Sequence, residues 1–246
     1  MKSTLRKAAV TGAFWHLADE FERRGWALEE RPSSRLTMLR QPSEDVQHKL
    51  IVHEPFGPTG LGLPSPEMLG LACTVNVVFS SIEATIDRAF GHEEGTAGHL
   101  SFRLTLSQLI GPEHLHAGNV HLLAIHDGSV AASAAEFLND FDRVLEPVRL
   151  RLATSAVFLD EGFVPHGVDG WSWNLRRAAY LREHADDATW HTYSAWIEGR
   201  AAKLEAESPA NEESVDGAYS SLASLRADAE RRGVAQVLRF LRHEAR

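Results

Sequence analysis

Cysteine is almost absent from this sequence, since Cys73 is the single one among 246 residues. No disulfide can therefore form within the chain. No stretch approaches the roughly 20 consecutive apolar residues of a transmembrane helix. The N-terminal stretch also lacks the apolar core and the small-residue cleavage site of a signal peptide. A lone cysteine is typical of a reducing compartment, so we expect a cytoplasmic protein without a membrane partner.

Positive charge is also scarce. The chain has 25 lysines and arginines against 34 aspartates and glutamates, which gives a net charge of −9. With 43% hydrophobic and 24% charged residues, the composition is otherwise that of an ordinary globular protein. A negative surface repels the phosphates of nucleic acids and of anionic membranes. We therefore expect no nucleic-acid partner.

Two segments with alternating side chains predict the centre of a β-sheet. Apolar side chains occupy every second position of residues 99–106, from Leu100 to Leu106, and Cys73 begins a similar row in residues 73–79. A period of two places each apolar row on one face of a strand. The two segments are therefore expected to pair in an antiparallel sheet that helices cover on one side.

The N-terminal region predicts a helix followed by a three-stranded meander. Apolar residues recur at helical spacing in residues 3–24, and Gly25 follows as a terminator. Clusters of turn-forming residues then separate three short segments with strand-like composition. These segments are residues 26–30, 35–41 and 46–53.

The rest of the chain predicts one more strand and then only helices. Residues 120–125 read as the last strand, and helical spacing resumes at Ser129, with Pro147 expected to kink or divide the helix. Further expected helices are residues 81–90, 174–184, 188–207 and 214–242. The predicted class is α+β, with an antiparallel sheet of about five or six strands, an N-terminal helix on one face and an all-helical C-terminal region. The expected division is a sheet domain over residues 1–128 and a helical region over residues 129–246 packed on it.

A histidine-rich passage is the candidate metal site. His114, His116 and His121 lie close together in the sequence, and imidazole is a common metal ligand. The spacing matches neither the HExxH motif nor another paired metal motif. Two interpretations stay open, namely surface imidazoles or a metal centre of a hydrolase.

Motifs of other catalytic classes are missing. The sequence has no GxSxG nucleophile elbow, and the glycines between Pro55 and Gly70 lack the GK[ST] ending of a phosphate-binding loop. Cys73 lies in an apolar row, which favours a buried structural thiol. We expect no cofactor and no catalytic residue.

The polar row of the predicted sheet is the candidate binding surface. Asn76, His99, Arg103 and Thr105 are expected on the face opposite the apolar row. This row is either solvated or, beneath the loop of residues 55–70, holds a partner segment or an anionic ligand through Arg103.

The order of elements resembles the bacterial family called domain of unknown function 4304, over residues 5–154. The residues that carry this resemblance are Phe21-Glu22-Arg23-Arg24-Gly25-Trp26, the strands 35–40 and 46–52, Val75-Asn76-Val77, and Leu145-Glu146-Pro147-Val148. The resemblance implies an α+β domain without an assigned catalytic residue, of a kind often found in toxin-immunity or defence gene neighbourhoods.

These observations predict a non-enzymatic protein-binding or immunity-type module whose acidic surface recognises a protein. The first alternative is a metal-assisted hydrolase that uses His114, His116 and His121. The second is a small-ligand sensor with its site beneath residues 55–70.

Replacement of Arg103 by alanine tests the polar row. If the row binds a partner through this guanidinium, Arg103→Ala weakens binding in a titration and leaves the melting temperature unchanged. Unfolding of the variant would instead assign Arg103 to the scaffold.

Overall fold

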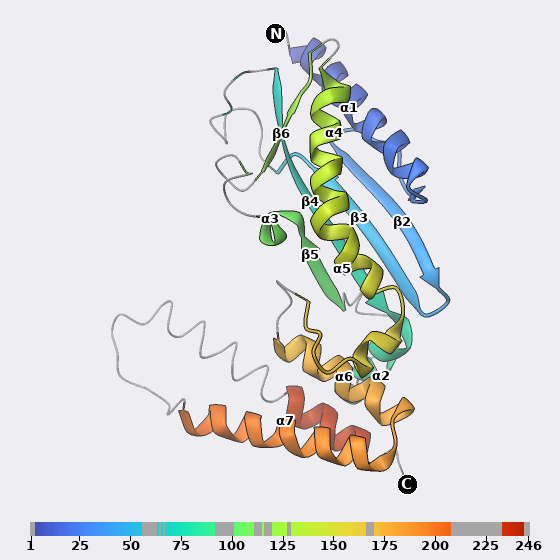
Figure 1. Cartoon of the computed structure of the whole chain (residues 1–246), viewed down its shortest axis with the longest axis vertical. Helices are drawn as coiled ribbons and strands as arrows, with labels where there is room; N and C mark the ends of the chain where they lie inside the picture. The colour runs from blue at the N-terminus through green and yellow to red at the C-terminus, as the bar shows by residue number, and fades with distance from the viewer. Residues whose placement is uncertain are drawn as a thin grey trace. The chain divides into compact units, whose positions relative to one another are not determined.

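The computed structural model describes most of the chain (Figure 1). The described residues are 3–55, 63, 65, 67–91, 101–110, 115, 120–126, 129–165, 170–207 and 233–243. Within these ranges, no helix has the length and apolar character needed to cross a bilayer.

The chain forms two compact units that are interleaved in sequence. Unit 1 comprises Met1–Val78, Phe102–Thr154 and Pro165–Gly167. Unit 2 comprises Phe79–Ser101, Ser155–Val164 and Val168–Arg246. Each is described by itself below.

A six-stranded sheet confirms the predicted α+β class. Its order is β1-β2-β3-β4-β5, and β6 also pairs with β4. The strands are β1 (Ala27–Leu28), β2 (Arg35–Ser43), β3 (Val46–His53), β4 (Met68–Phe79), β5 (Phe102–Thr105) and β6 (His121–Ala124). The bounds of β3 equal the predicted ones, because its alternating side chains are flanked by turn formers on the N-terminal side.

The expected pairing of the two alternating segments is confirmed. β4 and β5 are antiparallel, with Val75 opposite Leu104 and Asn76 opposite Arg103. β5 ends one residue earlier than predicted, because Leu106 already begins the short helix α3 (Leu106–Leu109) while its side chain stays buried. The alternating pattern alone therefore locates the strand correctly but misplaces its C-terminal end.

Two long helical segments lie side by side on one face of the sheet (Figure 1). They are α1 (Ser3–Arg23) and α4 (Val130–Asp140). The Phe21 ring of α1 meets the ring of Phe137 edge-on at 6.5 Å and that of Phe141 at 5.1 Å. The predicted terminator of α1, Gly25, has a φ of 82°, the left-handed conformation that glycine adopts without strain.

The helix after Ser129 is divided near Pro147, as predicted. A π-helical turn (Phe141–Leu145) follows α4, and α5 (Glu146–Arg151) has Pro147 in its first turn. Proline has no N–H to donate to the preceding turn, so it is tolerated where a helical segment begins.

A buried polar cluster joins α5 to the sheet. Arg149, whose side chain is 1% exposed, forms a two-pronged ion pair with Glu146 at 2.6 and 2.5 Å. Its third nitrogen donates to Nδ1 of His48 on β3 at 3.0 Å. Arginine has no acceptor, so His48 Nδ1 must be unprotonated, and Nε2 donates to the Leu152 carbonyl at 3.0 Å. The cluster therefore requires a neutral His48.

Unit 2 is helical in its described residues, and the described elements after Ser129, which belong to both units, are helical as predicted for the C-terminal region. It contains α2 (Ser80–Phe90), a 3₁₀ turn (Ser155–Leu159), α6 (Gly170–His184), α7 (Asp187–Glu207) and a helix over residues 233–243. Phe158 packs against Trp173 with ring centroids 4.7 Å apart. In the same unit, Arg176 donates two hydrogen bonds of 2.6 and 2.9 Å to the buried Glu83 carboxylate.

The neutral His48 makes the stability of unit 1 depend on pH. Burial lowers the pKa of His48 from 6.5 to about 4, and the neighbouring Arg149 and Arg40 charges act in the same direction. Between these two values the unfolded chain binds a proton that the folded chain does not, so stability falls as the pH falls. The total loss attributable to His48 is about 3 kcal/mol, complete near pH 4.

Urea unfolding of the wild type and of His48→Gln checks this effect. The stability difference between the two proteins is expected to shrink by about 3 kcal/mol from neutral pH to pH 4, since glutamine does not titrate. Parallel pH profiles would show that His48 does not carry the linkage.

Candidate functional site

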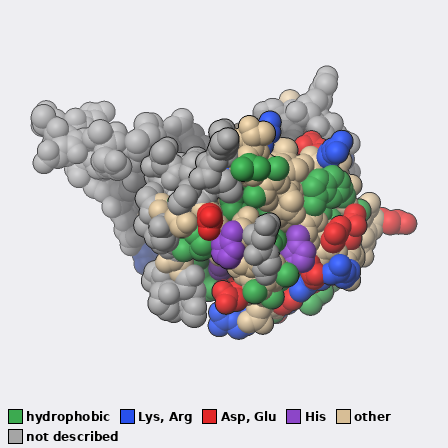
Figure 2. All heavy atoms as spheres, turned by 90° about the horizontal axis from the view of Figure 1, so that it is seen from above, with side chains coloured by type: hydrophobic (Ala, Val, Ile, Leu, Met, Phe, Trp, Pro, Cys, Tyr) green, Lys and Arg blue, Asp and Glu red, His purple; other side chains and the backbone are tan. Residues whose placement is uncertain are grey.

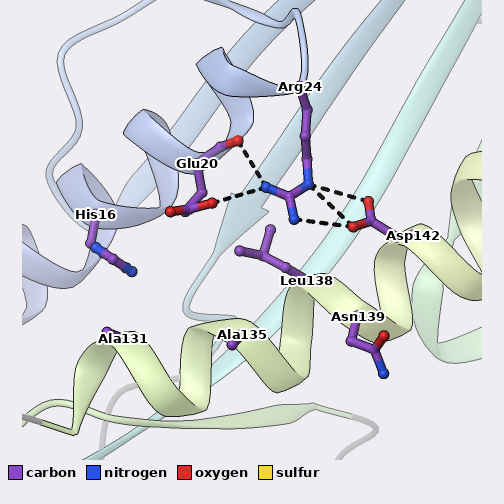
Figure 3. Close-up of a pocket in the computed structure, with 8 residues that line it drawn as sticks. All are labelled: His16, Glu20, Arg24, Ala131, Ala135, Leu138, Asn139 and Asp142. Carbon is purple, nitrogen blue, oxygen red and sulfur yellow. Dashed lines mark hydrogen bonds and ion pairs between the residues drawn. The ribbon is translucent and has the colours of Figure 1, made fainter.

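A groove between α1 and α4 is the candidate site of unit 1 (Figure 3). It has a volume of about 350 Å³. Its lining comes from α1 and the following turn, from α4, and from the start of the π-helical turn. The lining residues are His16, Glu20, Arg24, Ala131, Ala135, Leu138, Asn139 and Asp142.

Helical periodicity explains both walls. His16, Glu20 and Arg24 are each four residues apart, so they lie on one face of the N-terminal segment. On the other side, the side chains of Ala131 and Ala135 are too short to fill the space between the two helices. Leu138, which is 3% exposed, forms the buried floor.

Arg24 closes one end of the groove. Its Nε and Nη2 donate to the Asp142 carboxylate at 3.2 and 3.0 Å. Its Nη1 donates to the Glu20 carbonyl and carboxylate, each at 3.0 Å (Figure 3). The hydrogen bond to Asp142 raises the pKa of Arg24, so its guanidinium stays charged and committed to these partners.

The other side chains that line the groove are suited to binding another molecule. Within the lining set, two carboxylates face the committed Arg24 guanidinium. Glu20 also pairs with Arg23 outside the lining, so Asp142, with a 45% exposed side chain, is the more accessible carboxylate. Asn139 is an uncharged donor and acceptor on the opposite wall. The lining set contains no hydroxyl or thiol that could serve as a nucleophile. The groove is therefore arranged to accept apolar groups along its alanines and cationic groups at its rim.

The structure brings three residues of the predicted polar row together on one face of the sheet. Arg103 is exposed, its cross-strand neighbour Asn76 is 9% exposed, and Thr105 is opposite Thr74. Within the described structure, Oδ1 of Asn76 is buried and accepts no hydrogen bond. His99 lies outside the described residues, and binding by this row stays a prediction.

The predicted metal ligands are only partly described. His121 is buried on β6, with Nδ1 3.9 Å from Asp140 Oδ2 and its ring 5.4 Å from that of Phe137. His114 and His116 lie outside the described residues. In the part of the chain that the structure describes, no three histidine, cysteine or carboxylate side chains are grouped to hold a metal.

Cys73 is placed as the sequence predicts. Its side chain is 2% exposed on β4. Burial raises the pKa of the thiol, which keeps it protonated and unreactive.

The groove itself was not predicted from the sequence. Its signal was present in the four-residue spacing of His16, Glu20 and Arg24 and in the paired Ala131 and Ala135. Each pattern alone is also typical of a solvated helix face. Only the pairing of α1 with α4 makes them two walls of one groove.

Comparisons with models of known protein families, with curated proteins and with solved structures found no match to this chain.

The charge network at the groove is testable through the pKa of Glu20. The hydrogen bond from Arg24 is the main cause that lowers this pKa below its usual 4.5. Arg24→Gln is therefore expected to raise the Glu20 pKa toward 4.5, as measured by carboxyl-carbon NMR titration. Arg23→Gln is the comparison variant, because Arg23 also pairs with Glu20 but lowers its pKa less. A larger rise of the Glu20 pKa in Arg23→Gln than in Arg24→Gln would contradict the assignment.

Proposed function

We propose that this chain is a non-enzymatic protein-binding module whose α1–α4 groove accepts an amphipathic, basic segment of a partner protein. The observation that supports the proposal is an open groove with alanines on its α4 wall, a leucine floor and carboxylates at its rim. Two parallel or antiparallel helices with a gap between them are a common receptor for a third helix, which inserts apolar side chains at helical spacing.

The volume of the groove favours side chains of a polypeptide as its occupant. A volume of about 350 Å³ is near the lower end of small-molecule pockets. The alanines at positions 131 and 135 are one helical turn apart, which matches the i, i+4 spacing of apolar side chains on a docked helix. Two such side chains of leucine size would cover the Leu138 floor.

Charge favours a basic partner. The chain carries a net charge of −9, and Asp142 at the groove has a 45% exposed side chain. Lysine or arginine side chains on the docked segment would meet Asp142 and Glu20 at the rim. Rim charges contribute mainly to the association rate and to partner choice, so the binding should weaken with salt.

The resemblance to the domain of unknown function 4304 family supports a narrower proposal, that the partner is a toxin or defence protein of a bacterial cell. The single, buried Cys73 supports a reducing cytoplasm as the compartment. The hydrolase with His114, His116 and His121 and the sensor beneath residues 55–70 stay alternatives without a described site.

Matched alanine-to-phenylalanine variants test the groove. The wild-type chain is titrated calorimetrically with the proteins encoded by the adjacent genes, which are the natural first probes for an immunity-type module. Ala135→Phe fills the groove and is expected to weaken binding about 30-fold or more, as loss of a central contact does.

Ala132→Phe is the control, because Ala132 is exposed on the same helix and outside the lining. It is expected to change affinity less than about twofold, as peripheral positions do. Equal effects of the two variants, or turnover of a substrate by the purified chain with no effect of Ala135→Phe on any partner, would overturn the proposal. Loss of binding in Arg103→Ala alone would move the docking surface to the sheet.

A further inference from the structure

A second face of α1 is apolar although it is exposed. Leu5, Ala8, Gly12 and Trp15 follow one another at intervals of three, four and three residues, and all four are exposed. Leu5 is 60% and Trp15 36% exposed. At 100° per residue these positions share one side of the helix, opposite the buried side that carries Phe14. We call these four residues the outer stripe.

Alternating steps of three and four residues are the spacing of a helix–helix seam. A helix that is apolar on two opposite sides is normally covered on both. The sheet covers the inner side of α1. The face of the molecule seen in Figure 2 likewise carries exposed hydrophobic side chains among acidic, basic and histidine side chains.

Gly12 is the informative residue of the stripe. A glycine inside an exposed helix costs about 1 kcal/mol of stability relative to alanine. A Cβ placed at Gly12 would meet nothing within 4 Å, so no contact in the described structure requires a glycine there. Close approach of another bulky side chain from outside gives the glycine a physical reason.

We propose that α1 pairs with α1 of a second copy of this chain in an antiparallel, two-fold symmetric seam along the outer stripe. In the antiparallel register that places Trp15 over Gly12 of the other copy, symmetry places Gly12 under the other Trp15. The same register sets Ala8 opposite Asp19. The large indole then fills the space that the glycine leaves, once on each side of the two-fold axis.

Charge selects the antiparallel direction. At its C-terminal end the stripe continues into two exposed carboxylates, Asp19 and Glu22, beside one exposed cation, Arg23. The first turn of α1 contains no acidic residue and is followed by the exposed Lys7. An antiparallel pair places these carboxylates at the positive end of the partner's helix dipole. A parallel pair would bring four carboxylates together, which is unfavourable.

A seam along one helix is small, so we expect a reversible dimer. α1 has 21 residues and is therefore about 32 Å long, and its seam involves few large side chains. A stable dimer interface buries at least about 1,200 Å² in total. We expect dissociation in the micromolar range, with Trp15 as the dominant contact because tryptophan buries the most apolar area.

The test begins with the molar mass of the full chain, measured by light scattering and sedimentation across micromolar concentrations. A concentration-dependent dimer is expected, and a monomer at every concentration overturns the proposal. Trp15→Ala should weaken the dimer about 30-fold or more, because both copies lose the contact. Trp196→Ala, which removes a 47% exposed tryptophan of unit 2, is the matched control and should leave the dimer unchanged.

Gly12→Gln distinguishes a role of Gly12 in the dimer seam from a purely structural role in the helix. Glutamine is the better helix former, so the melting temperature of the monomer should rise while the dimer weakens. A rise in melting temperature with an unchanged dimer would place the interface elsewhere. Ala135→Phe should leave the dimer intact, which keeps this seam distinct from the groove.

Cysteine cross-linking tests the direction of the helices. Under oxidation, a mixture of Ala8→Cys and Asp19→Cys chains should form the mixed disulfide-linked dimer. Ala8→Cys alone should not, because eleven residues of helix separate the two copies of position 8 by about 16 Å along the seam. Efficient linkage of Ala8→Cys to itself would demonstrate a parallel pair and overturn the proposal.

Discussion

The hydrogen bond between Arg149 and His48 is the constraint on which the rest of unit 1 depends. Both side chains are buried, and Glu146 supplies the only carboxylate that the described contacts show on the guanidinium. A buried charge is tolerated only when it is paired and hydrogen-bonded. The pairing therefore holds α5 against His48 of β3. The π-helical turn connects α5 to α4, whose Phe137 packs on Phe21 of α1.

Helix α1 serves three surfaces at once, which follows from its residue pattern. Its inner side carries Phe14 and Phe21 into the core, one flank carries Glu20 and Arg24 along the groove, and the outer stripe is apolar and exposed. Because apolar side chains lie on two opposite sides, α1 as a whole shows little contrast between an apolar and a polar face. The assumption that a surface helix has one apolar face therefore underestimates how much of α1 is available for contacts.

Local rules predicted most of the fold, because they rest on neighbouring residues. Period two located the β4–β5 pair, turn formers delimited β3, and Gly25 marked the end of α1. The groove and the polar cluster were not predictable in the same way. Glu20 and Asp142, or His48 and Arg149, are about a hundred positions apart, and a buried arginine has no periodic signal that distinguishes it from a solvated one. Such sites arise from tertiary packing between residues far apart in the chain, which local sequence patterns do not reveal.

The interleaving of the two units has a consequence for synthesis. The core partners of Phe21 include Phe141, which lies 120 positions later, beyond the whole first segment of unit 2. At a ribosomal rate of about 5 to 20 residues per second, the Phe21 ring waits roughly 6 to 24 seconds for its partner. During that interval the nascent sheet has an open apolar face, so chaperones or slow elongation would matter more for this chain than for one whose units follow one another in sequence.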